Sequence, residues 1–477
     1  TIFPNLSAAR PVLLVSCALL LYLWTRRGPK APGKSLPGPA GWPLLGNALQ
    51  LGRLPHLTFC ELARRYGDVF QLRLGTRAVV VLNREAVIRQ ALVQQGGPFA
   101  GRPDFPSFHL VSGGKSMAFG RYTERWRAQR RVAHATLRAF STANTPSKRL
   151  FEQHVAAEAQ ELIEELVRLS AGGAYTDPAP LLTVANANVM CALCFGQRYS
   201  HGDSEFRALL GRNDRFGKTV AAGSLVDVLP WLQAFPNPVR SVFRDFQELN
   251  RELHEFVRAK VAQHRRTFRP GAPPRHISDA ILDCMEHGPG VQQGLVGDYV
   301  EGTLSDLFGA GQDTTSTALA WVLLLLLKHP LLRRQLQADL DRVVGRERLP
   351  TADDRASLPR LEAFLYETLR YSSFVPLTIP HATTADDPHV FDPTRFLDSE
   401  RGTLDRDRAC RVMIFSLGKR RCIGDQLAKL QLFLFTASLL HQCDLEPNPA
   451  EELSVDCEHG RTACCRLPVL APERRVP

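Results

Sequence analysis

The residues with the clearest chemical potential lie in the stretch Phe415–Gly424, which reads Phe-Ser-Leu-Gly-Lys-Arg-Arg-Cys-Ile-Gly. Cys422 stands just before an apolar run that predicts a buried helix from Asp425 onward. Unpaired N–H groups at a helix N-terminus favour thiolate over thiol, and Arg420 adds positive charge nearby. A structural zinc site needs four ligands, which this stretch does not offer. One thiolate suits a single axial bond to haem iron, and the alternative is a buried free cysteine after a loop.

Composition narrows the classes of protein and partner. The 477 residues are 44% hydrophobic and 22% charged, enough to bury one large core or two smaller ones. Eleven cysteines show no disulfide spacing, and we expect Cys191 and Cys194 to pack in the core of an apolar helix. Reduced thiols indicate that most of the chain faces the cytosol. The net charge of +11 comes with no nucleic-acid motif, so we expect an anionic membrane surface or an acidic protein partner and no nucleic acid.

The first residues predict a membrane anchor. Val12–Trp24 is an apolar run followed by Arg26 and Arg27, but it is short for a span, which needs about 20 residues. The chain begins with Thr1 and not with Met, so we expect the natural N-terminus to lie further upstream. A cleaved signal peptide is the alternative, although no cleavage site follows the run. We therefore predict an anchor at 1–27 with the following chain in the cytosol, a stiff proline-rich hinge at 28–47 and one catalytic domain at 48–477.

The rest of the chain predicts a mainly helical domain with little sheet. Alternating residues at 68–82 predict a pair of strands, and long amphipathic helices follow. One helix is predicted at Tyr299–Lys328, ~45 Å long. Its C-terminal half is apolar on all faces and must be buried, whereas its middle carries glycines, Asp313 and Thr314. These residues predict a local bulge that frees a backbone carbonyl, and a kinked core helix is the alternative.

The pattern formed by Phe415, Gly418, Arg420, Cys422 and Gly424 resembles the haem-binding signature of the cytochromes P450. The resemblance extends from about residue 36 to the end of the chain. It implies a mainly α fold with a small β-sheet, arranged as a single catalytic domain with an N-terminal anchor. It also implies haem b as cofactor, with the Cys422 thiolate as the axial ligand of the iron.

Two further groups of residues gain roles from this resemblance. Trp126 and Arg130 lie four residues apart, on one face of a predicted helix, and match the pair that holds a haem propionate in the family. A charge-assisted bond to a buried carboxylate is a strong interaction, which gives the pattern a physical basis. Arg420 and His381 are the remaining propionate partners that the resemblance implies.

The same resemblance assigns catalytic and structural residues. Thr314 corresponds to the threonine that hydrogen-bonds dioxygen at the haem, and Asp313 to the acid that helps relay protons through water. Glu367 and Arg370 match the Glu-x-x-Arg pair, which forms a structural triad with Arg395 in the family and supports the cysteine loop. Taken alone, the Glu–Arg pair would be an ordinary helix surface pair.

One departure from the family pattern concerns the segment between His381 and Phe391. The family normally places several short strands and turns there, whereas this chain has almost nothing between the two motifs. We therefore predict an internal deletion that removes part of the main sheet. A mispredicted exon, a splice variant or a decayed gene would each produce it, and it bears directly on folding and haem retention.

The wording around the motifs is most similar to family 1 of the cytochromes P450, B-type subfamily, for example at Tyr66–Phe70, Val111–Phe119 and Gly223–Trp231. Members of this subfamily oxidise flat polycyclic aromatics and steroids. Leu253 stands where an aromatic residue is usual, which bears on substrate choice. Ordinary core packing is the alternative for each residue that the resemblance places in the substrate pocket: Ala118, Phe119, Asn213, Phe216, Asp306, Gly309, Ala310 and Val375.

The functional hypothesis is a haem-thiolate monooxygenase that inserts one oxygen atom of O2 into planar aromatic, steroid or other lipophilic substrates. Its electrons come from NADPH through NADPH–cytochrome P450 reductase, with cytochrome b5 as a further candidate partner. We expect it at the endoplasmic reticulum membrane, with the catalytic domain on the cytosolic face. One alternative is an inactive or haem-deficient isoform that acts at most as a binding protein. Another is a P450 that rearranges oxygenated lipids, against which Asp313 and Thr314 argue.

Overall fold

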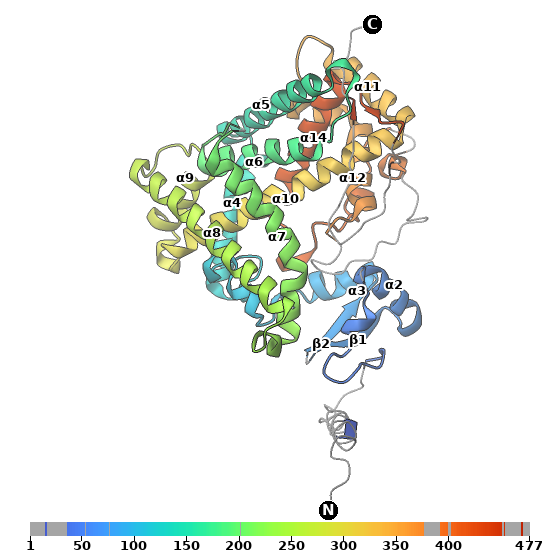
Figure 1. The fold of residues 1–477 in the computed structure, drawn as a ribbon. Helices are drawn as coiled ribbons and strands as arrows, with labels where there is room; N and C mark the ends of the chain where they lie inside the picture. Colours follow the sequence, from blue (N-terminus) through green and yellow to red (C-terminus); the bar gives the residue numbers. More distant parts are fainter. Residues whose placement is uncertain are drawn as a thin grey trace, which may run out of the picture. The chain divides into compact units, whose positions relative to one another are not determined.

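The computed structural model describes residues 15–16, 36–52, 54–75, 77–200, 202–375, 392–398, 402–450, 453 and 469–470. It consists of two compact units, Thr1–Asn83 and Arg84–Pro477. The predicted fold class is confirmed: the chain is mostly helical with a small antiparallel sheet (Figure 1). The predicted anchor at 1–27 lies outside the described residues, apart from a helical pair at 15–16. Within the described ranges, no single helix has the length and apolar composition of a membrane span; α10 and α11 meet that test only together, bent by 107°.

The first unit is built on a hairpin. Strands β1 (Val69–Leu74) and β2 (Arg77–Leu82) pair antiparallel, with Leu74 opposite Arg77, which confirms the predicted strand pair. The short helices η1 (Ala48–Gln50) and α2 (Pro55–Tyr66) precede the hairpin. A small core of Phe59, Phe70, Leu72 and Val81 holds α2 against the strands.

The described part of the proline-rich tract also belongs to this hairpin. The Gln71 N–H donates to the carbonyl of Pro37 at 2.8 Å, and the Asn47 N–H donates to that of Arg73 at 2.5 Å. A Cβ at Gly38 would lie only 1.8 Å from the Gln71 carbonyl oxygen, so the strand approaches the tract too closely for any side chain there. From residue 36 onward the tract is therefore packed against β1, where the sequence predicted a stiff spacer.

The second unit contains the long helices of the described residues. They are α4 (Glu124–Ser141), α5 (Pro146–Leu169), α6 (Ala179–Phe195), α7 (Ser204–Val228), α8 (Pro238–Thr267), α10 (Asp298–Lys328), α11 (Pro330–Val344), α12 (Pro359–Ser372) and α14 (Asp425–Gln442). Shorter helices are α3 (Glu85–Arg89), α9 (Ile277–Leu282) and α13 (Arg406–Ala409), and the two-residue strands β3 (Glu446–Pro447) and β4 (Val469–Leu470) pair antiparallel. Single-turn 3-10 or π segments include η2 (Gln90–Gln94), η4 (Pro106–His109), η5 (Val111–Gly114), η11 (Pro393–Phe396) and η12 (Gly418–Arg420).

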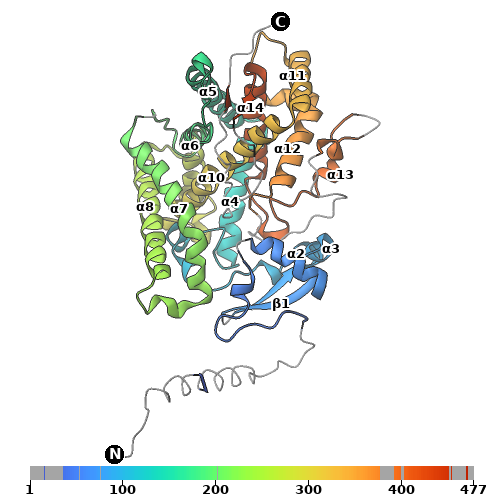
Figure 2. The same cartoon turned by 45° about the vertical axis from the view of Figure 1, so that its right-hand side comes forward.

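Helix α10 runs through the middle of this unit, between α4, α6 and α14 (Figures 1 and 2). Its C-terminal half is buried, as predicted, from Ala318 to Leu327. Two glycines let neighbours approach it closely: a Cβ at Gly311 would lie 2.4 Å from Cε of Met190 on α6, and one at Gly302 would lie 2.6 Å from Cβ of Lys115. The predicted bulge is wrong, because α10 is one continuous α-helix from Asp298 to Lys328.

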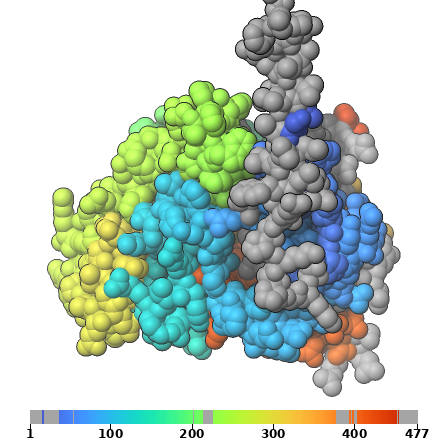
Figure 3. Space-filling model, turned by 90° about the horizontal axis from the view of Figure 1, so that it is seen from below, coloured from blue at the N-terminus to red at the C-terminus, as the bar shows by residue number. Residues whose placement is uncertain are grey.

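Helices α7 and α8 form a second layer beside α10, and the η4–η5 segment packs against both. Figure 3 shows this segment next to α7 and α8 on one face of the molecule. The Ser107 N–H and hydroxyl both donate to the buried carboxylate of Asp227, at 3.0 and 2.6 Å. Phe243 and Phe246 of α8 pack against Val226 at the end of α7. The η4–η5 segment, α7 and α8 are thus packed together beside α10.

Helix α6 confirms the interpretation of the Cys-x-x-Cys pair. Cys191 and Cys194 are both completely buried in the main core. Burial raises the pKa of both thiols, that of Cys194 to about 12. Neutral thiols in an apolar environment are packing residues and not reactive groups.

Candidate active site

The cysteine loop holds Cys422 in a fixed position at the start of α14. The Cys422 N–H donates to the Phe415 carbonyl at 2.8 Å, which closes the loop at the start of α14. Gly418 has φ of +70°, and a Cβ there would lie 1.8 Å from the carbonyl oxygen of Leu92 in η2, so only glycine fits. Gly424 is the N-cap of α14, and a Cβ on it would lie 4.0 Å from Sγ of Cys422. The loop is therefore braced on one side by η2 and leaves space beside the sulfur.

The thiol of Cys422 is the exposed end of this loop, although protein surrounds it on its other sides. Burial raises its pKa, whereas the N–H of Gly424 and the guanidinium groups of Arg130 and Arg421 act to lower it. The sequence predicted that the helix N-terminus would make a thiolate. The N–H of Gly424 favours the thiolate, as that prediction expected, but desolvation outweighs this effect and raises the pKa.

Arg420 is held next to Trp126 at the base of the same site. Its guanidinium lies 4.0 Å from the centre of the Trp126 ring. It donates to the backbone carbonyls of Ala100, Met117 and Gly120 at 2.8, 3.0 and 2.7 Å. The indole Nε1–H of Trp126 donates to the Met117 carbonyl at 2.9 Å. The structure thus brings together two residues that are far apart in the sequence and that the resemblance placed at the propionates.

Two more arginines join this group. Arg130 donates to the carbonyl of Arg421, and Arg102 donates to that of Ala118 at 2.9 Å. Burial lowers the pKa of Arg102, Arg130 and Arg420, and mutual repulsion lowers that of Arg420 further, to about 9. Among the described residues, no acid forms an ion pair with any of the three.

Three half-buried guanidiniums close together, with no acid paired to them among the described residues, form an unfavourable arrangement unless an anion binds there. Haem carries two carboxylates and needs one axial ligand, and this site offers cations beside an accessible thiol, so the residues present fit haem. Sequence reasoning missed Arg102. The available signal was its position: Arg102 lies between Gly101 and Pro103 in a short loop, where nothing requires an arginine in contact with solvent. His381, the fourth predicted propionate partner, lies outside the described residues.

The middle of α10 presents an accessible face within an otherwise buried helix. Ala310, Asp313 and Thr314 are all exposed, and their spacing puts them on one side of the helix. The Thr314 hydroxyl donates to the Ala310 carbonyl at 2.7 Å. The predicted catalytic pair is therefore accessible, and its hydroxyl has an acceptor on its own helix.

The opposite face of the same turn is held by amide side chains. Asn186 of α6 donates to the carbonyls of Gly311 and Gln312, at 3.1 Å for the former. Gln431 of α14 in turn donates to Asn186 Oδ1 at 2.5 Å. These partners bind carbonyls of α10 from the side, at the turn where the sequence predicted a bulge, and the helix is nevertheless continuous there.

Asp306 lies one turn earlier on α10 and holds the η5 loop. Its carboxylate accepts hydrogen bonds from the hydroxyls of Ser112 and Ser116, at 2.5 and 3.1 Å, and from the N–H groups of Met117 and Ala118. Burial raises its pKa, although these hydrogen bonds act in the opposite direction. The sequence placed Asp306 in the pocket lining. In the structure its oxygens instead fix the loop that carries Ala118.

The remaining predicted pocket residues lie around this loop and helix. Phe119 is partly exposed, and its ring packs on Phe108 at 4.7 Å. Cδ2 of Leu253 on α8 would be 3.7 Å from a Cβ on Gly309, so these two residues face each other. Val375 is half-buried at the end of the described part of its segment. The side chains of Asn213 and Phe216 lie outside the described atoms, and Phe108 was missed because nothing in its local sequence marks it.

The predicted structural pair is buried and well formed. Glu367 and Arg370 on α12 make two hydrogen bonds of 2.7 Å, with side chains 0% and 5% exposed. The N–H of Asp392 donates to Glu367 Oε1 at 2.9 Å, which ties the start of η11 to the pair. The side chain of Arg395, the third predicted member, lies outside the described atoms. The link from α12 to the segment that precedes the cysteine loop is thus visible without it.

Comparison with known proteins agrees with this geometry. The family described as Cytochrome P450 matches residues 36–387 and 386–460. The chain is 52% identical to cytochrome P450 1B1 of Homo sapiens, over 89% of this chain and 84% of that protein. It is 50% identical to cytochrome P450 1B1 of Mus musculus, over 93% and 87%, and 40% identical to cytochrome P450 1A1 of Oryctolagus cuniculus, over 96% and 95%.

Proposed function

Because the chain belongs to the cytochrome P450 family, we propose that it is a monooxygenase for planar aromatic and steroid substrates, with electrons passed from NADPH by a reductase. The general chemistry follows from the family: one oxygen atom of O2 enters a lipophilic substrate, and haem iron has a cysteine thiolate ligand. Bound haem supplies dioxygen binding and cleavage of the O–O bond. The residues of this chain would bind the haem, orient the substrate and deliver protons.

Cys422 would hold the iron, since it is the accessible thiol on a braced loop at a helix N-terminus. Arg102, Arg130 and Arg420 would hold the two propionates, exchanging backbone carbonyls for carboxylates as acceptors. A charged acceptor makes a stronger hydrogen bond than a carbonyl, and it also relieves the repulsion among the three guanidiniums. Trp126 would keep Arg420 in place through its ring and its own hydrogen bond to the same loop.

Thr314 would position the proton that oxygen activation consumes. Its hydroxyl donates to the Ala310 carbonyl, which leaves the lone pairs of Oγ1 facing the accessible side of α10. A water molecule can donate to that oxygen, and Asp313 on the same face can exchange protons with solvent. Asn186 and Gln431 support the back of this turn, so that the face does not shift when a substrate binds.

The observation that carries the substrate proposal is the pairing of small residues with aromatic rings. Gly309 and Ala310 have little or no side chain, so this face of α10 leaves room for a ligand. Phe119 and Phe108 supply packed aromatic rings on the η5 side. Small residues on one side and aromatic rings on the other suit a flat, rigid ring system better than a flexible chain. Leu253, opposite Gly309, is an aliphatic contact that such a ring can cover.

The partner and location remain parts of the proposal. The net charge of +11 supports association with an acidic redox partner, for which a NADPH–cytochrome P450 reductase and cytochrome b5 are the candidates. The apolar run at Val12–Trp24 with its following arginines supports attachment to the endoplasmic reticulum membrane, with the catalytic domain in the cytosol. The alternative of a haem-free binding protein is not favoured.

The internal deletion between His381 and Phe391 also stays a proposal. It is supported by the family match, which falls in two stretches that meet at residues 386–387, inside this segment. The segment joins α12 to η11, and Glu367 tethers η11 through the N–H of Asp392. A shortened connection would therefore act on the support of the cysteine loop before it acts on the α10 face.

The test combines the haem-loaded chain with NADPH–cytochrome P450 reductase and compares oestradiol with lauric acid, a linear chain. We expect NADPH-dependent hydroxylation of oestradiol at least tenfold faster than that of lauric acid. Gly309→Leu should abolish this preference by filling the space beside the α10 backbone. Gly309→Ala, whose Cβ would make an ordinary contact of 3.7 Å with Leu253, should keep most of it. Faster oxidation of lauric acid would refute the substrate class, and no NADPH-dependent product from either substrate would refute the reductase.

A further inference from the structure

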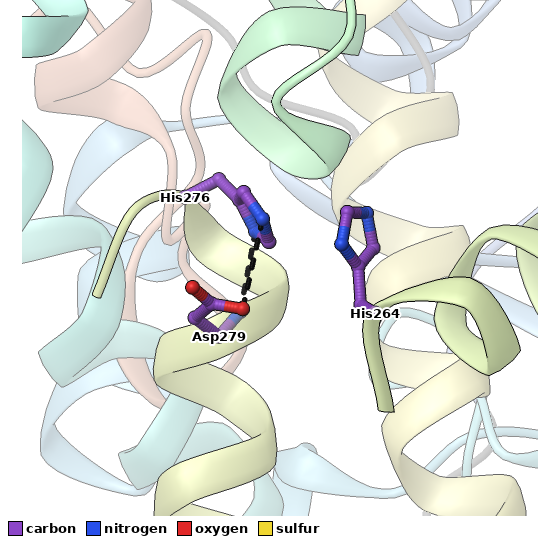
Figure 4. A group of neighbouring side chains, drawn as sticks. All are labelled: His264, His276 and Asp279. Carbon is purple, nitrogen blue, oxygen red and sulfur yellow. Dashed lines mark hydrogen bonds and ion pairs between the residues drawn. The ribbon is translucent and has the colours of Figure 1, made fainter. Parts of the chain in front are cut away.

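A second cluster of potential ligands lies at the junction of α8 and α9, far in sequence from the cysteine loop. His264 is near the C-terminal end of α8, and His276 and Asp279 are at the N-terminal end of α9 (Figure 4). One ligand atom from each residue lies within 4.8 Å of the other two. The pair His276 Nε2 and Asp279 Oδ1 is 3.6 Å apart. Among the described residues, this is the group of histidine, cysteine and acid side chains whose spacing could hold a metal ion.

The spacing approaches what a tetrahedral ion requires. Zinc–nitrogen and zinc–oxygen bonds of about 2.0–2.2 Å put neighbouring ligand atoms roughly 3.4 Å apart. The His276–Asp279 distance of 3.6 Å already agrees, and the ligand atom of His264 must move inward by about 1.4 Å at most to reach the same spacing. His264 is only half-buried and sits in the last turns of α8, which ends at Thr267, so a small rotation is available to it.

Burial disfavours the charged form of both histidines, and His276 is also held in place by its neighbours. Burial lowers the pKa of both His264 and His276, and for His276 the neighbouring His264 lowers it further. Burial acts to raise the pKa of Asp279, but hydrogen bonds from Arg275 more than offset it, so the carboxyl is ionised. His276 packs against the left-handed Gly196, where a Cβ would lie 2.7 Å from its ring. The cluster therefore offers two neutral imidazoles and one carboxylate at neutral pH.

Two existing interactions compete with a metal ion, and both leave a ligand atom available. Arg275 binds Asp279 Oδ2 through Nε at 2.6 Å and Oδ1 through Nη2 at 3.0 Å. Oδ1 can turn to an ion while Oδ2 keeps Arg275, although this guanidinium competes with the ion for the carboxylate. His276 Nδ1 accepts the Asp279 N–H at 3.3 Å as the cap of α9, and binding through Nε2 gives up that long hydrogen bond.

We propose that His264, His276 and Asp279 form a zinc site that joins the end of α8 to the start of α9. Two imidazole nitrogens with one carboxylate select a borderline divalent ion such as Zn²⁺, whereas Ca²⁺ and Mg²⁺ prefer oxygen ligands throughout. Arg275, which pairs with Asp279, has a side chain that is 52% exposed, so an ion and its water can reach the cluster from that side. The site is distinct from the haem and substrate region, and it shares no residue with them.

The experiment measures zinc content of the full, haem-loaded chain without a polyhistidine tag. The protein is treated with EDTA, dialysed against zinc chloride at controlled free concentration, and analysed for zinc per haem by mass spectrometry. His276→Asn is the main variant, because asparagine also caps a helix and so removes the ligand while keeping the cap. His154→Gln is the control, since His154 is another partly buried histidine on a different helix.

We expect the wild type and His154→Gln to bind one zinc ion per chain more than His276→Asn. Arg275→Gln should bind zinc at least threefold more tightly than the wild type, because it frees Asp279, an effect that no purely structural role of the cluster predicts. Circular dichroism and the haem spectrum confirm that each variant is folded, and Asp279→Asn replaces His276→Asn if the latter is not. Equal zinc content in the wild type and the ligand variant would refute the site, and so would weaker zinc binding by Arg275→Gln.

Discussion

Replacing Glu367 by Gln should destabilise the protein strongly, because it removes the buried carboxylate that pairs with Arg370 in the core. Both side chains are almost fully buried, and their two hydrogen bonds of 2.7 Å hold the charges in contact. Breaking one partner of such a buried pair costs about 3–5 kcal/mol. Against a total stability of about 5–15 kcal/mol, this is a large fraction and corresponds to roughly a hundredfold to several thousandfold more unfolded protein.

Urea unfolding, followed by circular dichroism and by the haem absorbance on the same samples, measures this change. The matched control is Glu165→Gln on α5, since Glu165 and Arg168 have the same i, i+3 spacing and two hydrogen bonds of 2.7 and 2.6 Å but lie on the surface. The control should leave the midpoint where it is, because solvent screens that pair. The double replacement Glu367→Met with Arg370→Met should be less harmful than the single change, because it removes both charges of the pair together. A midpoint for Glu367→Gln equal to that of the wild type would refute the structural role of the pair.

Two further outcomes are expected. Thr314→Ala should keep haem and substrate binding but release peroxide, because it removes the Thr314 hydroxyl that orders the proton; an unchanged yield of product per NADPH would contradict this role. Insertion of the family's strand segment after Ala385 should raise haem content per chain relative to the chain as written, since unpaired strand partners cost about 1–3 kcal/mol for each buried group. Full haem occupancy of the uninserted chain would show that the deletion between His381 and Phe391 has no such effect.

The sequence predicted the features that depend on local spacing. The loop of Cys422, the exposed pair of Asp313 and Thr314 and the ion pair of Glu367 with Arg370 each occupy a few consecutive residues, so a pattern along the chain defines them. Periodicity likewise indicated the buried half of α10 and the β1–β2 hairpin. In these cases the neighbours that matter are neighbours in the sequence.

The features that it missed depend on partners brought together by folding. The bulge in α10 was predicted from its glycines and threonines, but the helix is continuous, and its carbonyls at Gly311 and Gln312 accept hydrogen bonds from Asn186 of α6. Asp306 holds a loop that is far from it along the chain. The raised pKa of Cys422 reflects desolvation by the surrounding fold, which no helix-end argument includes. The group of Arg102 with the other site arginines has the same origin.

The measurement that tests the central assignment most directly is the difference spectrum of the reduced protein with carbon monoxide. The wild type should show the band of a haem with a thiolate ligand, and Cys422→Ser should lose it, because a hydroxyl is a poor donor to ferrous iron. Cys194→Ala, which removes a buried thiol from the core of α6, should retain the band. A thiolate band that persists in Cys422→Ser would contradict the assignment of Cys422 as the haem ligand.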